Sequence, residues 1–300
     1  MDALDGHQAR KVQDTPLEDA FDHGADSVSL VYLTMATCCA LQLGTNPFCM
    51  LVFCMTASAV FYVLHWKLYA TGVFKYLWPF AETEAQLAAC LVFVTSAAIG
   101  PAVWNTEVPV FGGKIKVLLV CACAAGGAVT CAQGGREILL RGRHHAWQTV
   151  QATDVAAPLA ILSAITATAV LVPSLDTALF LHQPCVFVLV LGTAMAKGNA
   201  RIIGAYDTFS DAPYLDSCLL ILGTILVISG LNGVTSGLHD RTALWDSRLL
   251  VASLVMCTAD LVFVMCTADL VFVSLFVMCT ADLVFVSLFI CLFVAGDVHS

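Results

Sequence analysis

In the stretch DALDGHQARKVQDTPLEDAFDHGAD, residues 2–26, four of the six aspartates form two pairs at helical spacings. Asp2 and Asp5 are three residues apart, and Asp22 and Asp26 are four residues apart. Residues at these spacings share one face of a helix, so two such pairs on neighbouring helices would bring four carboxylates together. Carboxylates that close repel one another unless a cation neutralises them, and Mg²⁺ and Mn²⁺ prefer oxygen ligands. The stretch therefore predicts two helices that meet at a divalent-cation site.

Two residues between the aspartate pairs indicate a phosphate ligand. Gly6 would allow close approach of the backbone, and Arg10 would offer a forked cation to a phosphate. The alternative is an acidic loop that is simply solvated.

Composition places the chain in a membrane. Of its 300 residues, 59% are hydrophobic and 12% are charged, with a mean hydropathy of +0.87. Soluble domains carry about 25% charged residues. We therefore expect an all-α fold, a polytopic integral membrane protein. The net charge is −9, and no basic patch with interleaved aromatic residues is present, so we expect no nucleic-acid partner.

Apolar runs long enough to cross a bilayer, about 20 residues each, predict about eight spans. Breakers such as Pro101, Pro173 and Pro213 separate them. The predicted spans are 25–43, 48–66, 85–104, 115–133, 155–173, 178–196, 214–233 and one crossing within 249–295.

The basic residues indicate an orientation. If the first segment is cytosolic and the sides alternate, nine basic residues fall on the cytosolic side and four on the other, as the positive-inside rule favours. The cytosolic nine are Arg10, Lys11, Lys67, Lys75, Arg136, Arg141, Arg143, Lys197 and Arg201.

The C-terminal tract repeats itself. MCTADLVFV occurs at 256–264, 265–273 and 278–286. At about 100° per residue the aspartates of the three copies point in different directions, so they form no continuous polar stripe. A single helix over this tract would be roughly 70 Å long against a hydrocarbon core of about 30 Å. We therefore expect two regions, a transmembrane domain over 1–235 and a last tract over 249–295 that breaks, doubles back or protrudes.

The first stretch matches D-x2-D-G-x2-A-R followed by x3-D-x3-D, and thereby resembles the CDP-alcohol phosphatidyltransferase family. The choline/ethanolaminephosphotransferase branch is the most similar. Five segments resemble that branch in order: TPLEDAFDHGADS at 15–27, QLGTNP at 42–47, HWKLYATG at 65–72, TEAQ at 83–86 and HQPCVFVLVLGTAMAK at 182–197.

The resemblance implies roles for the motif residues. Asp2, Asp5, Asp22 and Asp26 would bind Mg²⁺ or Mn²⁺, and Asp26 would also act as the general base. Gly6, Ala9 and Arg10 would hold the nucleotide and its phosphates.

The resemblance also implies substrates and a location. The reaction would transfer phosphoethanolamine or phosphocholine from CDP-ethanolamine or CDP-choline to diacylglycerol and release CMP. We expect a homodimer among membrane lipids of the endoplasmic reticulum or Golgi, with the active site facing the cytosol.

Two features of this sequence depart from the family pattern and lead to an alternative function. Glu18 stands where the family motif has a glycine, and the family's first two of about ten spans would precede most of this sequence. The alternative is therefore a catalytically inactive fragment or scaffold of the same family. A further alternative is a transporter or channel that uses Asp260, Asp269 and Asp282 of the repeat. It is disfavoured because these side chains would point in different directions on a helix.

His65 and Glu84 flank the cytosolic segment that follows the second span. They would serve as a polar shell around the site or as another base. The competing interpretation is interfacial anchoring, because Trp66 and Tyr69 lie close by and aromatic residues favour membrane interfaces.

Overall fold

The computed structural model describes residues 16–74, 82–109, 112–145, 154–208, 210, 212, 216–234 and 242–266. Helices make up nearly all of this part of the chain. A two-residue antiparallel pair, β1 (Glu107–Val108) and β2 (Gly113–Lys114), and short 3-10 turns connect some of them. The helices are α2 (Pro16–Ala40), α3 (Pro47–Thr71), α4 (Glu82–Ile99), α5 (Ile115–His145), α6 (Ala157–Leu175), α7 (Thr177–His182), α8 (Pro184–Asp207), α9 (Ser217–Val234) and α10 (Thr242–Cys266).

Local chemistry sets the ends of α3. Pro47 opens the helix where a free backbone N–H is not needed, and the Asn46 side chain accepts a hydrogen bond from the Cys49 backbone N–H at 3.4 Å. Gly72 ends the helix with a positive φ of 67°, a conformation that favours glycine. Pro47 therefore acts as a predicted breaker, whereas Pro173 lies inside α6 and does not end it there.

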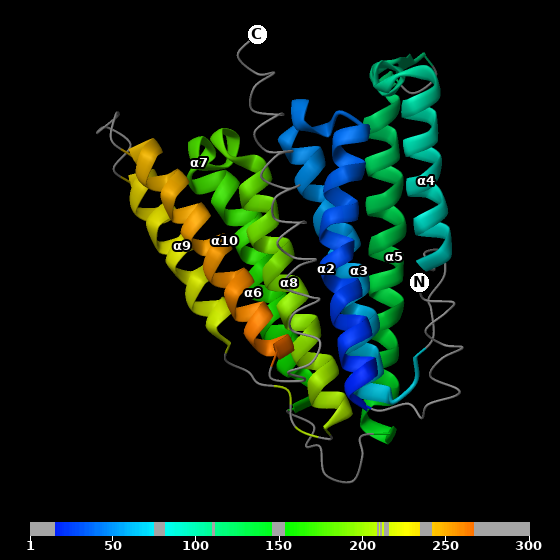
Figure 1. Cartoon of the computed structure of the whole chain (residues 1–300), viewed down its shortest axis with the longest axis vertical. Helices are drawn as coiled ribbons and strands as arrows, with labels where there is room; N and C mark the ends of the chain where they lie inside the picture. The colour runs from blue at the N-terminus through cyan, green and yellow to red at the C-terminus, as the bar shows by residue number, and fades with distance from the viewer. Residues whose placement is uncertain are drawn as a thin grey trace.

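The helices form one bundle (Figure 1). In this view α4 and α5 lie on one side and α9 and α10 on the other, with α2, α3 and α8 between them. Helix α8 packs against α2, α3 and α10, and it is the most buried of the apolar helices. The core of the described part is thus centred on α8.

Four helices in the described residues are long and apolar enough to cross a membrane: α3, α6, α8 and the Ile115–Leu140 part of α5. Large apolar side chains also face outward on the bundle, among them Leu91 and Val94 on α4 and Leu220 on α9. Such a surface suits lipid. The predicted all-α polytopic membrane fold is confirmed, while the number of eight spans stays a prediction.

One predicted span differs in the structure. The run 178–196 is divided, because α7 ends at His182 and α8 begins at Pro184. Proline disfavours a helical conformation in the residue before it, and Gln183 accordingly has φ −135° and ψ 53°. The spanning helix is therefore shifted to 184–207.

The repeat is described only through Cys266, within its second copy. Asp260 of the first copy lies on α10, whereas Asp269 and Asp282 lie outside the described residues. The division into regions 1–235 and 249–295 stays a prediction.

Candidate functional site

The acidic cluster predicted on the first helix is partly described. On α2, single ligand atoms of Asp22, His23 and Asp26 lie within 4.8 Å of one another, and all three side chains are half-buried. One helical turn separates the two aspartates, which places their carboxylates on one face. Two carboxylates and an imidazole at this spacing can share one divalent cation.

The other half of the predicted motif lies outside the described residues: Asp2, Asp5, Gly6, Ala9 and Arg10. Glu18 lies on α2, and its backbone alone is described. The structure therefore brings Asp22 and Asp26 together as predicted and leaves the other assignments as predictions. Sequence reasoning missed His23, although its position between the two aspartates was a signal.

His65 on α3 extends this cluster across a helix interface. Its ring lies edge-on to the ring of His23, with 5.2 Å between the centroids, and its side chain is 1% exposed. Nδ1 lies 2.9 Å from the Phe61 carbonyl oxygen. Because a carbonyl only accepts, Nδ1 carries the proton and the neutral ring keeps a lone pair on Nε2.

That Nε2 atom is buried and has no hydrogen-bond partner within the described ranges. Buried polar atoms are usually paired, so an unpaired acceptor beside an acidic cluster indicates a place for a ligand. Burial and contact with His23 favour the polar-shell interpretation of His65 over interfacial anchoring.

The neighbours of His65 are hydrogen-bonded to connecting segments that precede α6 and α9. Trp66 donates through Nε1 to the Val155 carbonyl oxygen at 2.7 Å, and the Tyr69 hydroxyl oxygen accepts from the Ala212 backbone N–H at 3.1 Å. These bonds hold α3 in one rotational position. Glu84, the other predicted polar residue, is exposed on α4.

Two glycines of α8 set how closely α2 and α3 approach it. A Cβ placed on Gly192 would lie 2.8 Å from Cγ1 of Val31, and one on Gly198 would lie 2.9 Å from Cε2 of Tyr62. Contacts that short do not occur without a shift. The glycines therefore allow α2 and α3 to approach α8 closely.

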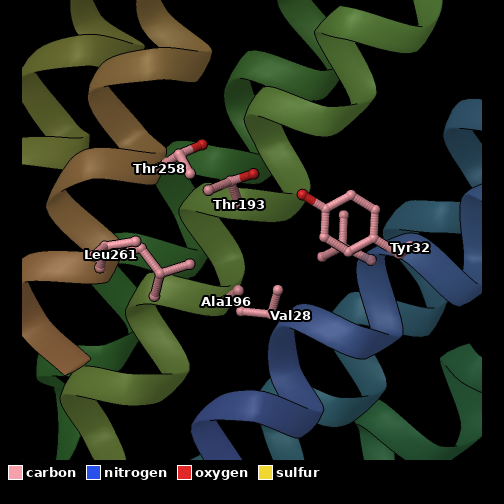
Figure 2. A pocket seen from close by; sticks show the side chains of 8 residues that line it. Val28, Tyr32, Thr193, Ala196, Thr258 and Leu261 are labelled. Atoms are coloured by element: carbon pink, nitrogen blue, oxygen red, sulfur yellow. The ribbon is translucent and has the colours of Figure 1, made fainter. Parts of the chain in front are cut away.

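An apolar pocket opens between α2, α8 and α10, close to the cluster in sequence (Figure 2). Val28, two residues after Asp26, lies in its wall, and Figure 2 shows the Tyr32 hydroxyl pointing toward α8. The remaining walls come from α8 and α10. Its lining is Val28, Val31, Tyr32, Thr193, Ala196, Thr258, Leu261 and Val262.

A buried ion-pair network lies on another face of α8. The Lys197 ammonium contacts Asp216 Oδ1 at 2.7 Å and Asp260 Oδ2 at 2.6 Å. It also donates to the Ser217 hydroxyl, which in turn donates to Asp260. The network joins α8 to α9 and α10.

Both buried lysines that the topology prediction placed in cytosolic segments lie inside helices. Lys197 is within α8, and Lys67 is within α3, where its ammonium is 3.4 Å from Glu137 Oε2 of α5. Their partners are distant in sequence, so spacing alone gave no signal for them. Because the positive-inside rule counts basic residues in loops, these two lysines are weaker evidence for the membrane orientation than basic residues in loops are.

No family model matches the chain, but three curated proteins show what it is similar to. Cholinephosphotransferase 1 of Xenopus laevis is 30% identical over 252 residues, which are 83% of this chain and 62% of that protein. Human cholinephosphotransferase 1 is also 30% identical over 252 residues, covering 83% and 61%. Human ethanolaminephosphotransferase 1 is 27% identical over 245 residues, covering 79% and 60%. The chain thus spans about 62% of the length of the first of these relatives.

Proposed function

Because this chain belongs to the choline/ethanolaminephosphotransferase branch of the CDP-alcohol phosphatidyltransferases, we propose that it transfers phosphocholine or phosphoethanolamine to diacylglycerol. The donor is the CDP-alcohol, and CMP is the leaving group. The observation that carries the proposal is the Asp22–His23–Asp26 cluster, which lies next in sequence to an apolar pocket. The cluster suits the charged donor and the pocket suits the lipid acceptor.

The donor set fits a hard divalent cation. Asp22 and Asp26 supply carboxylate oxygens, which suit Mg²⁺ and Mn²⁺, and Asp2 and Asp5 are proposed as the remaining ligands. When bound, the cation neutralises charge on the pyrophosphate and on the departing CMP. Gly6, Ala9 and Arg10 are proposed to hold the nucleotide.

The chemistry needs a group that accepts the diacylglycerol proton. The hydroxyl oxygen forms a bond to the phosphorus that carries the amino alcohol, the bond from that phosphorus to CMP breaks, and the hydroxyl proton goes to the base. Asp26 is proposed as this base. His65 is the second candidate, because its buried Nε2 has a lone pair and no partner in the described part of the chain.

The acceptor is proposed to occupy the pocket between α2, α8 and α10. Its aliphatic wall suits an acyl chain, and its hydroxyl groups could contact the glycerol portion.

An assay of lipid products tests the proposal. Membranes that contain the chain are incubated with diacylglycerol and either labelled CDP-choline or labelled CDP-ethanolamine, with Mg²⁺ or Mn²⁺. Labelled phospholipid from either donor supports the proposal, and the ratio of products gives the preferred alcohol. Absence of both products, with the chain folded and inserted, would favour the inactive scaffold.

We further propose that the site faces the cytosol of endoplasmic reticulum or Golgi membranes and that the protein is a homodimer. The distribution of basic residues supports the orientation.

A further inference from the structure

Four aromatic rings lie together beside the acidic cluster. The ring of His65 lies 4.4 Å from that of Phe61 and 5.9 Å from that of Phe74, measured between centroids. His23, which belongs to the cluster, lies 5.6 Å from Phe74 by the same measure. The two phenylalanines carry no group that binds a metal or moves a proton, and the proposed transfer chemistry uses neither. What the face of such a ring can bind is an organic cation.

The turn after α3 fixes the position of Phe74. Gly72 ends the helix with a φ of 67°, and the Val73 backbone N–H donates to the Thr71 hydroxyl oxygen at 3.4 Å. The chain thereby turns so that the ring of Phe74 contacts that of His65 within α3. Phe74 is nevertheless 39% exposed, so part of its ring is accessible beyond the end of this apolar helix.

The length of the amino-alcohol phosphate matches this arrangement. A ring nitrogen of His23 and one carboxylate oxygen each of Asp22 and Asp26 lie within 4.8 Å of one another, so the His23 ring connects the cluster to Phe74. Four bonds separate phosphorus from nitrogen in phosphocholine, a distance of about 5 Å. Cation–π attraction acts within about 6 Å of a ring centroid. A phosphate held at the cluster can thus place its ammonium group over the ring of Phe74.

A phenyl ring treats the two amino alcohols differently. The trimethylammonium group of choline carries a positive charge and no N–H, so the face of an aromatic ring suits both its charge and its methyl groups. The primary ammonium group of ethanolamine has three N–H donors. Against a phenyl ring these donors lose water without gaining an acceptor, which is costly. A ring at this place therefore stabilises choline more than ethanolamine.

We propose that Phe74 forms the amino-alcohol subsite: its ring binds the trimethylammonium group of CDP-choline, and the chain therefore prefers CDP-choline to CDP-ethanolamine. This inference rests on the proposed function. His65 is 1% exposed and keeps the ring of Phe74 in place from behind, while His23 holds it next to the cation site.

Equilibrium binding tests the inference without any assay of turnover. The purified full chain in lipid nanodiscs without diacylglycerol is titrated with CDP-choline or with CDP-ethanolamine, each with Mn²⁺, and calorimetry gives the dissociation constants. The unchanged chain should bind CDP-choline more tightly. Phe74→Leu keeps an apolar side chain but removes the ring, so the dissociation constant of CDP-choline should rise about 3–30-fold. That of CDP-ethanolamine should stay constant.

Phe48→Leu is the matched control. Phe48 lies near the other end of α3, is 50% exposed, and has a ring neighbour in Phe180 at 5.0 Å. It thus has the same exposure and the same kind of contact, but it is distant from the acidic cluster along the helix. Its replacement should leave both dissociation constants unchanged.

Phe74→Trp keeps the test decisive should Phe74→Leu not fold. Indole is the strongest aromatic partner of a cation, and the partial exposure of Phe74 leaves room for the larger ring. CDP-choline should bind this variant more tightly, while CDP-ethanolamine binds as before. Unchanged or weaker binding of CDP-choline by the folded variant would contradict the inference.

The same titrations separate failure of this inference from failure of the proposed function. If the unchanged chain binds both CDP-alcohols and Phe74→Leu weakens neither or both equally, Phe74 is not the subsite and the proposed function stands. If the unchanged chain binds neither donor, the proposed function is overturned and this inference with it.

Discussion

Lys197 of α8 and Asp260 of α10 form an ion pair inside the bundle, with Nζ 2.6 Å from Oδ2. The lysine side chain is 1% exposed, so the pair is shielded from solvent on one side. It fixes the first copy of the repeat against α8.

We predict that Asp260→Asn destabilises the protein by about 3–5 kcal/mol, the range for removing one partner of a buried ion pair. Asp216 remains beside Lys197, which places the value at the lower end. Thermal unfolding in detergent measures the effect. Glu84→Gln is the control, because Glu84 is exposed on α4, and it should leave the unfolding temperature unchanged. Equal effects of the two changes would contradict a stabilising role of the pair.

Gly192→Ala should loosen the contact between α2 and α8. The added Cβ would lie 2.8 Å from Val31 Cγ1, and overpacking of this kind costs about 1–3 kcal/mol. Gly204→Ala on the same helix meets nothing within 4 Å and should stabilise α8 by about 0.5–1 kcal/mol through helix propensity. Unfolding temperatures compare the two, and Val31→Ala should restore stability to Gly192→Ala. A lack of rescue would place the strain elsewhere.

Asp26→Asn and His65→Gln distinguish the two candidate bases. Asp26→Asn should weaken Mn²⁺ binding and lower kcat by about 10²–10⁴, as expected on loss of a general base. His65→Gln should keep Mn²⁺ affinity and most of kcat. Steady-state kinetics and Mn²⁺ titration measure both. A loss of 10²–10⁴ in His65→Gln, at about unchanged Mn²⁺ affinity, would instead make His65 the base.

Filling the pocket should weaken binding of the lipid alone. Thr193→Leu places a larger, apolar side chain in the lining of the pocket. KM for diacylglycerol should therefore rise about tenfold or more, while KM for the CDP-alcohol stays constant. Thr166→Leu is the control, because Thr166 is exposed on α6 and makes the same kind of bond to the carbonyl four residues before it. A rise in both constants would argue against a separate lipid pocket.

Sequence reasoning predicted most helices from their apolar runs, but Pro173 and the pair Gly134–Gly135, predicted as breakers, lie inside α6 and α5. Pro47 and Gly72 bound α3 as their chemistry requires, and α6 lies close to its predicted range. The break at Gln183 was missed, because the apolar run continues across this residue although the helix is interrupted there.

The candidate site was predictable only where spacing encodes it. Asp22 and Asp26 are one turn apart, so their proximity followed from helix geometry. The approach of His65 to His23 and of Lys197 to Asp260 depends on how helices distant in sequence pack, and no spacing specifies that.

The most direct measurement compares cation-dependent transfer by the unchanged chain and by Asp22→Ala in the same lipid vesicles. The account predicts labelled phospholipid from a labelled CDP-alcohol and diacylglycerol with Mg²⁺ or Mn²⁺, none with a chelator, and none from Asp22→Ala, although that variant inserts and unfolds normally. Transfer that persists in Asp22→Ala or in chelator would contradict it.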